Sequence, residues 1–225
     1  MDLNIHATPD DVADAAALRI LELISRSKGQ FSLGLAGGST PAATYSRLRE
    51  TDIDWSGVNA WLADERWVPP DDDRCNGRMA AETLTDHIDA TLHRPKWSED
   101  ARPEDVAAEY ETTIRSISPR GHPDLVLLGM GDDGHTASLF PGTEALEEDK
   151  RWVVANYVPQ IDEVRITATY PLLWASGQVI FLVTGPGKAT ALKDTFSGDT
   201  PAGHVGRGEG KVEWHVDTAA ASLLS

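Results

Sequence analysis

Short apolar runs recur along the chain, each bounded by glycine, proline or polar residues. Runs of this length, rich in valine, leucine and isoleucine, predict β-strands that are buried on both faces. We expect strands at Phe31–Ala36, Val58–Ala63, Asp124–Gly129, Trp152–Tyr157, Arg165–Tyr170, Gln178–Thr184 and Val212–Val216.

Between these runs, apolar residues recur at helical spacing. An alanine-rich segment that begins near Pro9 repeats Val12, Ala16, Ile20 and Ile24 on one face. Further helices are expected from Thr40, as a cap, to about Leu48, at Asn76–Ile88, at Glu104–Ile117, from Pro186 to about Phe196, and, as a short helix, from Thr136 to Phe140. Alternating strands and helices predict an α/β fold with a mostly parallel central sheet flanked by helices on both faces.

The organisation of the chain indicates a single domain over residues 1–225, because no internal repeat and no low-complexity linker divides it. Two polar, Gly/Pro-rich segments, Pro69–Asp73 and Thr195–Gly210, are expected to be mobile loops at the edges of a cleft.

Composition excludes several classes of partner. The net charge of −16 argues against binding to nucleic acid or to an anionic membrane surface. No apolar run is long enough to cross a bilayer, and the N-terminus lacks the pattern of a secretory signal. The single cysteine, Cys75, cannot form an intramolecular disulfide, so we expect a reducing cytoplasm. An anionic substrate would need a local positive site on this acidic chain.

A histidine follows one of the predicted strands. The strand Asp124–Gly129 leads into a glycine-rich turn that carries Asp133 and His135 at the carboxyl end of the sheet, where α/β folds bind ligands. His135 could be a general base oriented by Asp133, a metal ligand, or a structural residue that closes the turn. Since no second histidine or cysteine lies at ligand spacing, we expect no metal.

A second glycine-rich turn follows the strand that begins at Phe31. Here Gly37, Gly38, Ser39 and Thr40 end the strand and open a helix. Glycine allows close backbone approach, and a helix N-terminus attracts anions, so the segment suits a phosphate group. The alternative is a tight structural turn with a threonine cap.

Three cations lie at the ends of predicted elements. Arg66 follows the strand Val58–Ala63, Arg165 begins another strand, and Lys188 opens a helix. Each could be an ordinary solvated charge, and Arg66 could simply pair with a carboxylate. Together they could form the local positive site that an anionic substrate requires, with Arg66 at a phosphate or a developing oxyanion.

These motifs, in this order, resemble the 6-phosphogluconolactonase family over nearly the whole chain. The matching blocks are Ala36-Gly-Gly-Ser-Thr-Pro41, Asp64-Glu-Arg-Trp-Val-Pro69 with Asn76, Leu128-Gly-Met-Gly-Asp-Asp-Gly-His-Thr-Ala-Ser-Leu-Phe-Pro141, Arg165-Ile-Thr167, Thr184-Gly-Pro-Gly-Lys188 and Trp214-His-Val-Asp-Thr-Ala-Ala220. The related glucosamine-6-phosphate deaminases share the fold and an Asp-Gly-His. They usually continue into Ile-Ala-Phe-Asn-Glu and carry Asp-Glu-Tyr where this chain has Arg66, so both differences favour the lactonase.

The resemblance implies a Rossmann-like fold of the glucosamine-6-phosphate isomerase type. It also implies hydrolysis of 6-phospho-D-glucono-1,5-lactone in the oxidative pentose phosphate pathway, by a monomer or homodimer without cofactor. The residues are consistent with His135 as the base and Asp133 as its orienting carboxylate. On this hypothesis the helix-opening turn, Arg165 and Lys188 hold the phosphate.

Two alternatives to this activity remain at the level of sequence. One is an isomerase/deaminase that acts on glucosamine 6-phosphate and releases ammonia. The other is a non-catalytic sugar-phosphate-binding domain of the kind found in some transcription regulators. Against the second, the chain shows neither a helix-turn-helix segment nor the basic charge for binding DNA.

Overall fold

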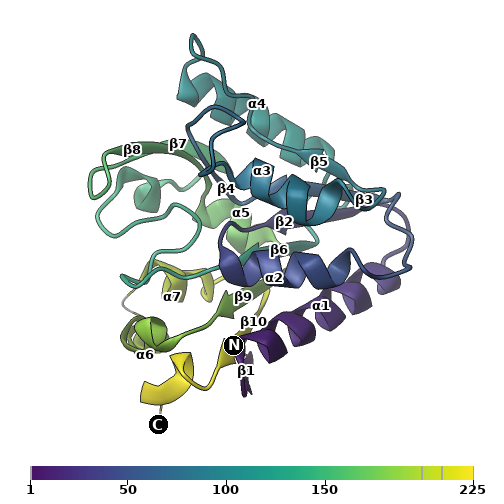
Figure 1. Cartoon of the computed structure of the whole chain (residues 1–225). Coiled ribbons are helices and arrows are strands. Elements are labelled where there is room, and N and C mark those ends of the chain that lie inside the picture. The colour runs from purple at the N-terminus through teal and green to yellow at the C-terminus, as the bar shows by residue number, and fades with distance from the viewer. Residues whose placement is uncertain (1, 199, 209, 225) are drawn as a thin grey trace.

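A parallel sheet forms the centre of the protein, whose computed structural model describes residues 2–198, 200–208 and 210–224 (Figure 1). The sheet has seven strands in the order β1-β10-β9-β6-β2-β3-β5, and all neighbouring pairs run parallel. The strands are β1 Asp2–His6, β2 Phe31–Leu35, β3 Val58–Leu62, β5 Thr91–His93, β6 Leu125–Leu128, β9 Gln178–Val183 and β10 Lys211–Asp217. The predicted fold class is confirmed.

Helices cover both faces of this sheet. The α-helices are α1 Pro9–Arg26, α2 Ser39–Leu48, α3 Asn76–Ala80, α4 Pro103–Ser116, α5 Tyr170–Ala175, α6 Ala189–Ser197 and α7 Pro201–Val205. Shorter turns are the π-helical η1 Ala81–Thr85 and the 3₁₀ segments η2 Glu144–Glu147, η3 Pro186–Lys188 and η4 Ala220–Leu223.

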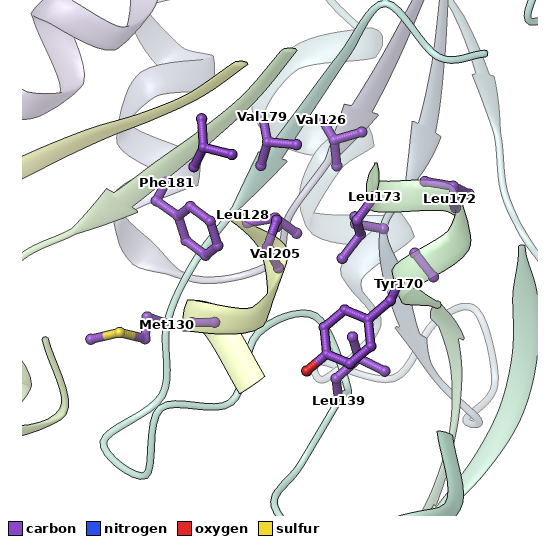
Figure 2. Close-up of a cluster of buried hydrophobic side chains, with 14 of the residues drawn as sticks. Val126, Leu128, Met130, Leu139, Tyr170, Leu172, Leu173, Val179, Phe181 and Val205 are labelled. Carbon is purple, nitrogen blue, oxygen red and sulfur yellow. The ribbon is translucent and has the colours of Figure 1, made fainter. Parts of the chain in front are cut away.

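The central strands are apolar throughout because successive side chains enter two different cores. In β6, Val126 and Leu128 join a cluster with α4, α5 and α7, whereas Leu125 and Leu127 join a cluster with α1 and α2. Figure 2 shows the first cluster, where strand residues lie close to Leu173 of α5. Burial on both faces explains why these strands were visible as continuous apolar runs.

Two of the predicted strands lie outside the central sheet. A separate antiparallel sheet has the order β4-β8-β7, with β4 Asp64–Arg66, β7 Val153–Val158 and β8 Glu163–Ala168. The predicted strand Arg165–Tyr170 therefore starts and ends too late. Pro171 stands in the first turn of α5, because proline suits a helix N-terminus and cannot donate to a ladder.

Sequence reasoning missed the two edge strands of the central sheet. Strand β1 is exposed along most of its length and mixes polar with apolar residues, so it shows no apolar run. Strand β5 comprises only three residues, none of them buried. Edge strands bury less surface than central ones, and their hydrophobic pattern is correspondingly weak.

Three predictions for helices need correction. The segment from Thr136 to Phe140 is a tight turn, in which Thr136 bridges Leu139 and Ala137 adopts a φ of 47°. Hydrogen bonds from this turn to other segments replace those of a helix. The predicted helix 76–88 is α3 followed by η1 and ends at Thr85. Helix α2 begins at Ser39 with Gly38 as its N-cap, not with a threonine cap.

Of the two predicted loops, the second differs from expectation. Residues 69–73 form a loop, and 195–210 include the end of α6 and the whole of α7, whose cap is Thr200. Residues 199 and 209 of the second segment lie outside the described residues. Neither segment contributes a described residue to the wall of the main cleft, and Pro70 of the first segment lines a smaller pocket.

Candidate active site

The main cleft lies at the carboxyl ends of neighbouring parallel strands. After β2 the chain turns to β3 on one side, and after β6 it proceeds to β9 on the other side. Adjacent strands whose connections diverge leave a crevice, which is where open α/β sheets bind ligands. The cleft has a volume of about 470 Å³. The predicted site residues in its wall are Gly37, Gly38, Ser39, Thr40, Arg66, His135, Arg165 and Lys188.

The first wall is the turn between β2 and α2. Gly38 has a φ of 109°, a value that favours glycine, and it serves as the N-cap of α2. A glycine N-cap supplies no side-chain oxygen to the N–H groups of the first helical turn, which suits an external anion. Gly37 must be small, because a Cβ there would lie 2.1 Å from Oδ1 of Asn76.

The second wall holds His135 in a defined orientation. Oδ1 of Asp133 accepts hydrogen bonds from the ring Nδ1 of His135 at 2.6 Å and from its backbone N–H at 3.0 Å. The imidazole stacks on Phe140 with ring centroids 3.8 Å apart. Asp133 itself does not line the cleft, so it contacts His135 from outside the cleft. An Nδ1–H that donates to this carboxylate leaves Nε2 as the basic nitrogen.

The charge of Asp133 is favoured by its contacts with the histidine. Burial raises the pKa of Asp133, but hydrogen bonds from His135 and the attraction of its ring outweigh that effect and hold the pKa below its ordinary value. Asp133 is therefore ionised at neutral pH. An ionised partner orients the imidazole and stabilises its protonated form, as a general base requires.

Two arginines form a third wall. Arg66 on β4 and Arg165 on β8 are register partners in the antiparallel sheet. Arg66 donates to the carbonyl of Arg74 at 2.6 Å, and Arg165 donates to Glu163 at 2.6 Å. Burial, followed by the proximity of Arg66, lowers the pKa of Arg165. Adjacent guanidinium groups of this kind attract an anion.

Lys188 is the last residue of η3, in the segment that follows β9. Its Nζ lies 2.6 Å from Oδ1 of Asp132. Nearby, the Oγ1 atoms of Thr40 and Thr184 are 2.8 Å apart, which ties the start of α2 to the end of β9. The two anion-binding segments predicted separately from sequence therefore form one corner of the cleft.

Sequence reasoning did not single out a buried polar network in the same cleft. Asp64, Asn76 and Ser138 all line it. Ser138 Oγ donates to Oδ2 of Asp64 at 2.7 Å, and Asn76 Nδ2 donates to the carbonyl of Asp64 at 2.9 Å. Asn76 appeared in the family pattern without a role. The only local signal was position, since Asp64 lies two residues before Arg66 and Ser138 lies three residues after His135.

Glu65 supports part of this network through hydrogen bonds from the backbone. Its carboxylate accepts hydrogen bonds from the backbone N–H groups of Arg66, Asn76 and Gly77 at 2.7 to 2.8 Å. Burial raises the pKa of Glu65, and these hydrogen bonds oppose the rise. Glu65 thereby joins β4 to the N-terminus of α3 and positions Asn76 in the cleft.

Within residues 2–198, 200–208 and 210–224, no group of three or more histidine, cysteine, aspartate or glutamate side chains is arranged for a cation. His135 has Asp133 as its carboxylate partner, and the neighbouring Asp132 is turned to Lys188.

Comparisons with known proteins concern the sequence and the fold of this chain. The family model described as glucosamine-6-phosphate isomerases/6-phosphogluconolactonase matches residues 7–214. A 6-phosphogluconolactonase from Nostoc sp. is 34% identical over 244 residues, which cover 100% of both chains.

Solved structures show the same fold. A 6-phosphogluconolactonase from Trypanosoma brucei superposes with a TM-score of 0.88 at 29% identity, over 100% of this chain and 98% of the other. A monomeric glucosamine-6-phosphate deaminase superposes with a TM-score of 0.85 at 24% identity, over 99% of this chain and 100% of the other. The second likeness concerns the fold alone.

Proposed function

Because this chain belongs to the family of glucosamine-6-phosphate isomerases and 6-phosphogluconolactonases, we infer that it hydrolyses 6-phospho-D-glucono-1,5-lactone to 6-phospho-D-gluconate. This is the lactone-opening step of the oxidative pentose phosphate pathway. The observation that supports it best is the cleft itself, where an Asp133-oriented His135 shares one space with Arg66, Arg165 and Lys188.

In this proposal the phosphate anchors the substrate. Arg165, Lys188 and the N-terminal turn of α2 (Gly37 to Thr40) bind it, and all of them line the cleft. Charge-assisted hydrogen bonds from guanidinium and ammonium groups, together with a helix N-terminus, suit a dianionic phosphate. A fixed phosphate leaves the ring at the other end of the cleft, with the lactone carbonyl near His135.

His135 then acts as the general base. Its Nε2 removes a proton from water while the water oxygen attacks the lactone carbonyl carbon, and the negative charge moves to the carbonyl oxygen. As the tetrahedral intermediate collapses, the bond from that carbon to the ring oxygen breaks and the imidazolium returns the proton to the ring oxygen. The product is a carboxylic acid that ionises. General base catalysis of this kind contributes about 10²–10⁴ in rate.

Arg66 has two possible tasks that differ in their kinetic effect. If it stabilises the oxyanion, its loss lowers kcat, because the interaction exists only in the transition state. If Arg66 binds the phosphate, its loss raises KM with little change in kcat. The pairing of Arg66 with Arg165 across the strands supports a shared anion and therefore favours the second task.

The decisive experiment compares the phosphorylated lactone with unphosphorylated glucono-1,5-lactone in a coupled assay, after subtraction of spontaneous hydrolysis. We expect a strong preference for the phosphorylated lactone and a loss of at least 10²-fold in kcat for His135→Ala. Wild-type turnover in that variant would overturn the role of His135. Ammonia released from glucosamine 6-phosphate would reveal a deaminase, and tight binding without hydrolysis would reveal a sensor.

We further propose that the chain works as one domain in the cytoplasm, as a monomer or homodimer. The buried free Cys75 supports this compartment. Among the described residues, no helix has the length and apolarity needed to span a membrane.

A further inference from the structure

Two adjacent aspartates contact two different residues of the cleft wall. Asp133 accepts hydrogen bonds from His135, whereas Asp132 forms an ion pair with Lys188, with 2.6 Å between Nζ and Oδ1. The proposed reaction uses Asp133, His135 and Lys188. It assigns no role to Asp132, although Asp132 neutralises a cation that the substrate phosphate needs.

The position of Asp132 is set by its loop. The N–H of Gly131 donates to the carbonyl of His135 at 2.8 Å, and the N–H of Gly134 donates to the carbonyl of Gly131 at 3.1 Å. The N–H of Ala202 on α7 donates to the carbonyl of Gly134 at 3.0 Å. These bonds close the turn and attach it to a helix, so the carboxylate of Asp132 stays near the cleft when Lys188 moves.

The two partners differ in exposure. The side chain of Lys188 is 28% exposed and lines the cleft, whereas that of Asp132 is 76% exposed and does not line it. Asp132 therefore approaches Lys188 from the solvent side. An ion pair with one such exposed partner is weak and exchanges readily. A phosphate dianion that enters the cleft can displace Asp132 from the ammonium group of Lys188.

We propose that Asp132 sets the affinity of the enzyme for the phosphate group, as an internal competitor for Lys188. The phosphate displaces the carboxylate when the lactone binds, and the carboxylate takes Lys188 back when the phosphorylated product leaves. This inference rests on the proposed phosphate site. It adds a residue that weakens binding of lactone and product alike, and so favours product release.

The expected effect follows from charge. Replacement of Asp132 by asparagine removes both the competing ion pair and one negative charge beside a dianion. Because the carboxylate is largely solvated, the gain in affinity is about three- to tenfold. We expect Asp132→Asn to lower KM for the phosphorylated lactone by that factor. The dissociation constant of 6-phosphogluconate, measured by calorimetry, should fall equally. Unphosphorylated gluconolactone should show no change.

A matched control removes the same charge elsewhere. Asp149 is exposed and does not line the cleft. Asp149→Asn changes the net charge equally and should leave both constants unaltered. An equal decrease of both constants in the two variants would mean that Asp132 acts only through the net negative charge of the protein. That result would overturn the proposal.

A double-mutant cycle tests whether Asp132 acts through Lys188. We expect Lys188→Ala to raise KM strongly, and Asp132→Asn to have little further effect in the Lys188→Ala background. If Lys188→Ala leaves KM unchanged, the proposed phosphate site is wrong. If Lys188→Ala raises KM but Asp132→Asn changes neither KM nor product affinity, the role of Asp132 alone is wrong. The role of Asp132 is also wrong if Asp132→Asn lowers KM by the same factor in the Lys188→Ala background as in the wild type. Asp132→Ser repeats each measurement with a smaller side chain.

Discussion

Arg66 and Arg165 lie opposite each other on the antiparallel strands β4 and β8, and the Nε atom of each is buried without a hydrogen-bond partner among the described residues. Neighbouring like charges oppose folding, as does burial of a donor without an acceptor. The arrangement is explained if an anion occupies the space that both guanidinium groups face. On that proposal, the two guanidinium groups lower the stability of the folded protein and strengthen the binding of an anion.

The first prediction concerns Arg165→Gln. Loss of this guanidinium should raise KM for the phosphorylated lactone at least tenfold, because hydrogen bonds to charged groups are worth about 1.5–3 kcal/mol. The melting temperature should stay the same or rise, since the repulsion from Arg66 is gone. Kinetics and thermal melts on the same preparation check both parts. A lower melting temperature with an unchanged KM would mean that Arg165 is only structural.

The second prediction concerns the glycine turn below the histidine. A Cβ at Gly131 would lie 2.1 Å from Nδ1 of His135 and 2.7 Å from Oδ1 of Asp133. Gly131→Ala should therefore displace the imidazole and lower kcat at least tenfold, with a smaller change in KM. The matched control is Gly187→Ala, since a Cβ there meets no atom within 4 Å among the described residues. Equal activity of both variants would contradict the requirement for this orientation.

The third prediction concerns Glu65, which is 6% exposed. In Glu65→Gln, one carboxylate oxygen that accepts a backbone N–H becomes an amide donor, so at least one buried N–H loses its acceptor. The cost should be about 2 kcal/mol, or about 4–8 °C in melting temperature for a chain of this size. Activity should also fall, because Asn76 loses its support. Glu82→Gln, at an exposed glutamate of η1, serves as the control and should melt like the wild type.

The fourth prediction concerns pH and His215 on β10. Burial, and then the adjacent His6, lowers the pKa of His215 below its ordinary value of 6.5. Glu213 opposes this shift and Arg19 adds to it. Below pH 6.5 the unfolded chain thus takes up a proton more readily than the folded protein does. Stability is therefore full above that pH and is lost as the pH falls toward the folded pKa.

Thermal melts between pH 7.5 and 5.5 test this dependence. One such group contributes at most about 1.4 kcal/mol per pH unit. The wild type should lose melting temperature over this interval, and His215→Asn should lose less. Asparagine at this position can still hydrogen-bond to His6, whose Nε2 lies 3.2 Å from Nδ1 of His215. The same substitution at the exposed His87 should keep the wild-type slope, whereas identical slopes in all three proteins would refute the assignment.

Much of the candidate site was predictable because it lies on local motifs. Glycine-rich turns after β2 and β6 place the proposed phosphate-binding residues Gly37 to Thr40 and His135 at one edge of a parallel sheet, whatever the details of packing. Asp133 is only two residues from His135, so their contact is a local one. The roles of these residues remain predictions until the variants are measured.

The rest depended on contacts between distant segments. Arg66 and Arg165 are opposed only because β4 pairs with β8 in a separate sheet. The turn at Ser138 is not a helix because its backbone N–H donates to Thr167 at 3.0 Å and its hydroxyl to Asp64. Such hydrogen bonds override local helical preference, and nothing in the spacing of the segment indicates them.

The sequence by itself determined the parallel sheet, the two glycine turns and the family, because buried strands and close backbone approaches restrict which residues can stand there. Only the tertiary structure decided that Asp132 faces Lys188, that Glu65 supports Asn76, and that the guanidinium groups of two arginines are neighbours. Hydrophobic periodicity reports burial along one segment. The pairing of charges across a cleft depends on how separate segments pack, and this information is not local.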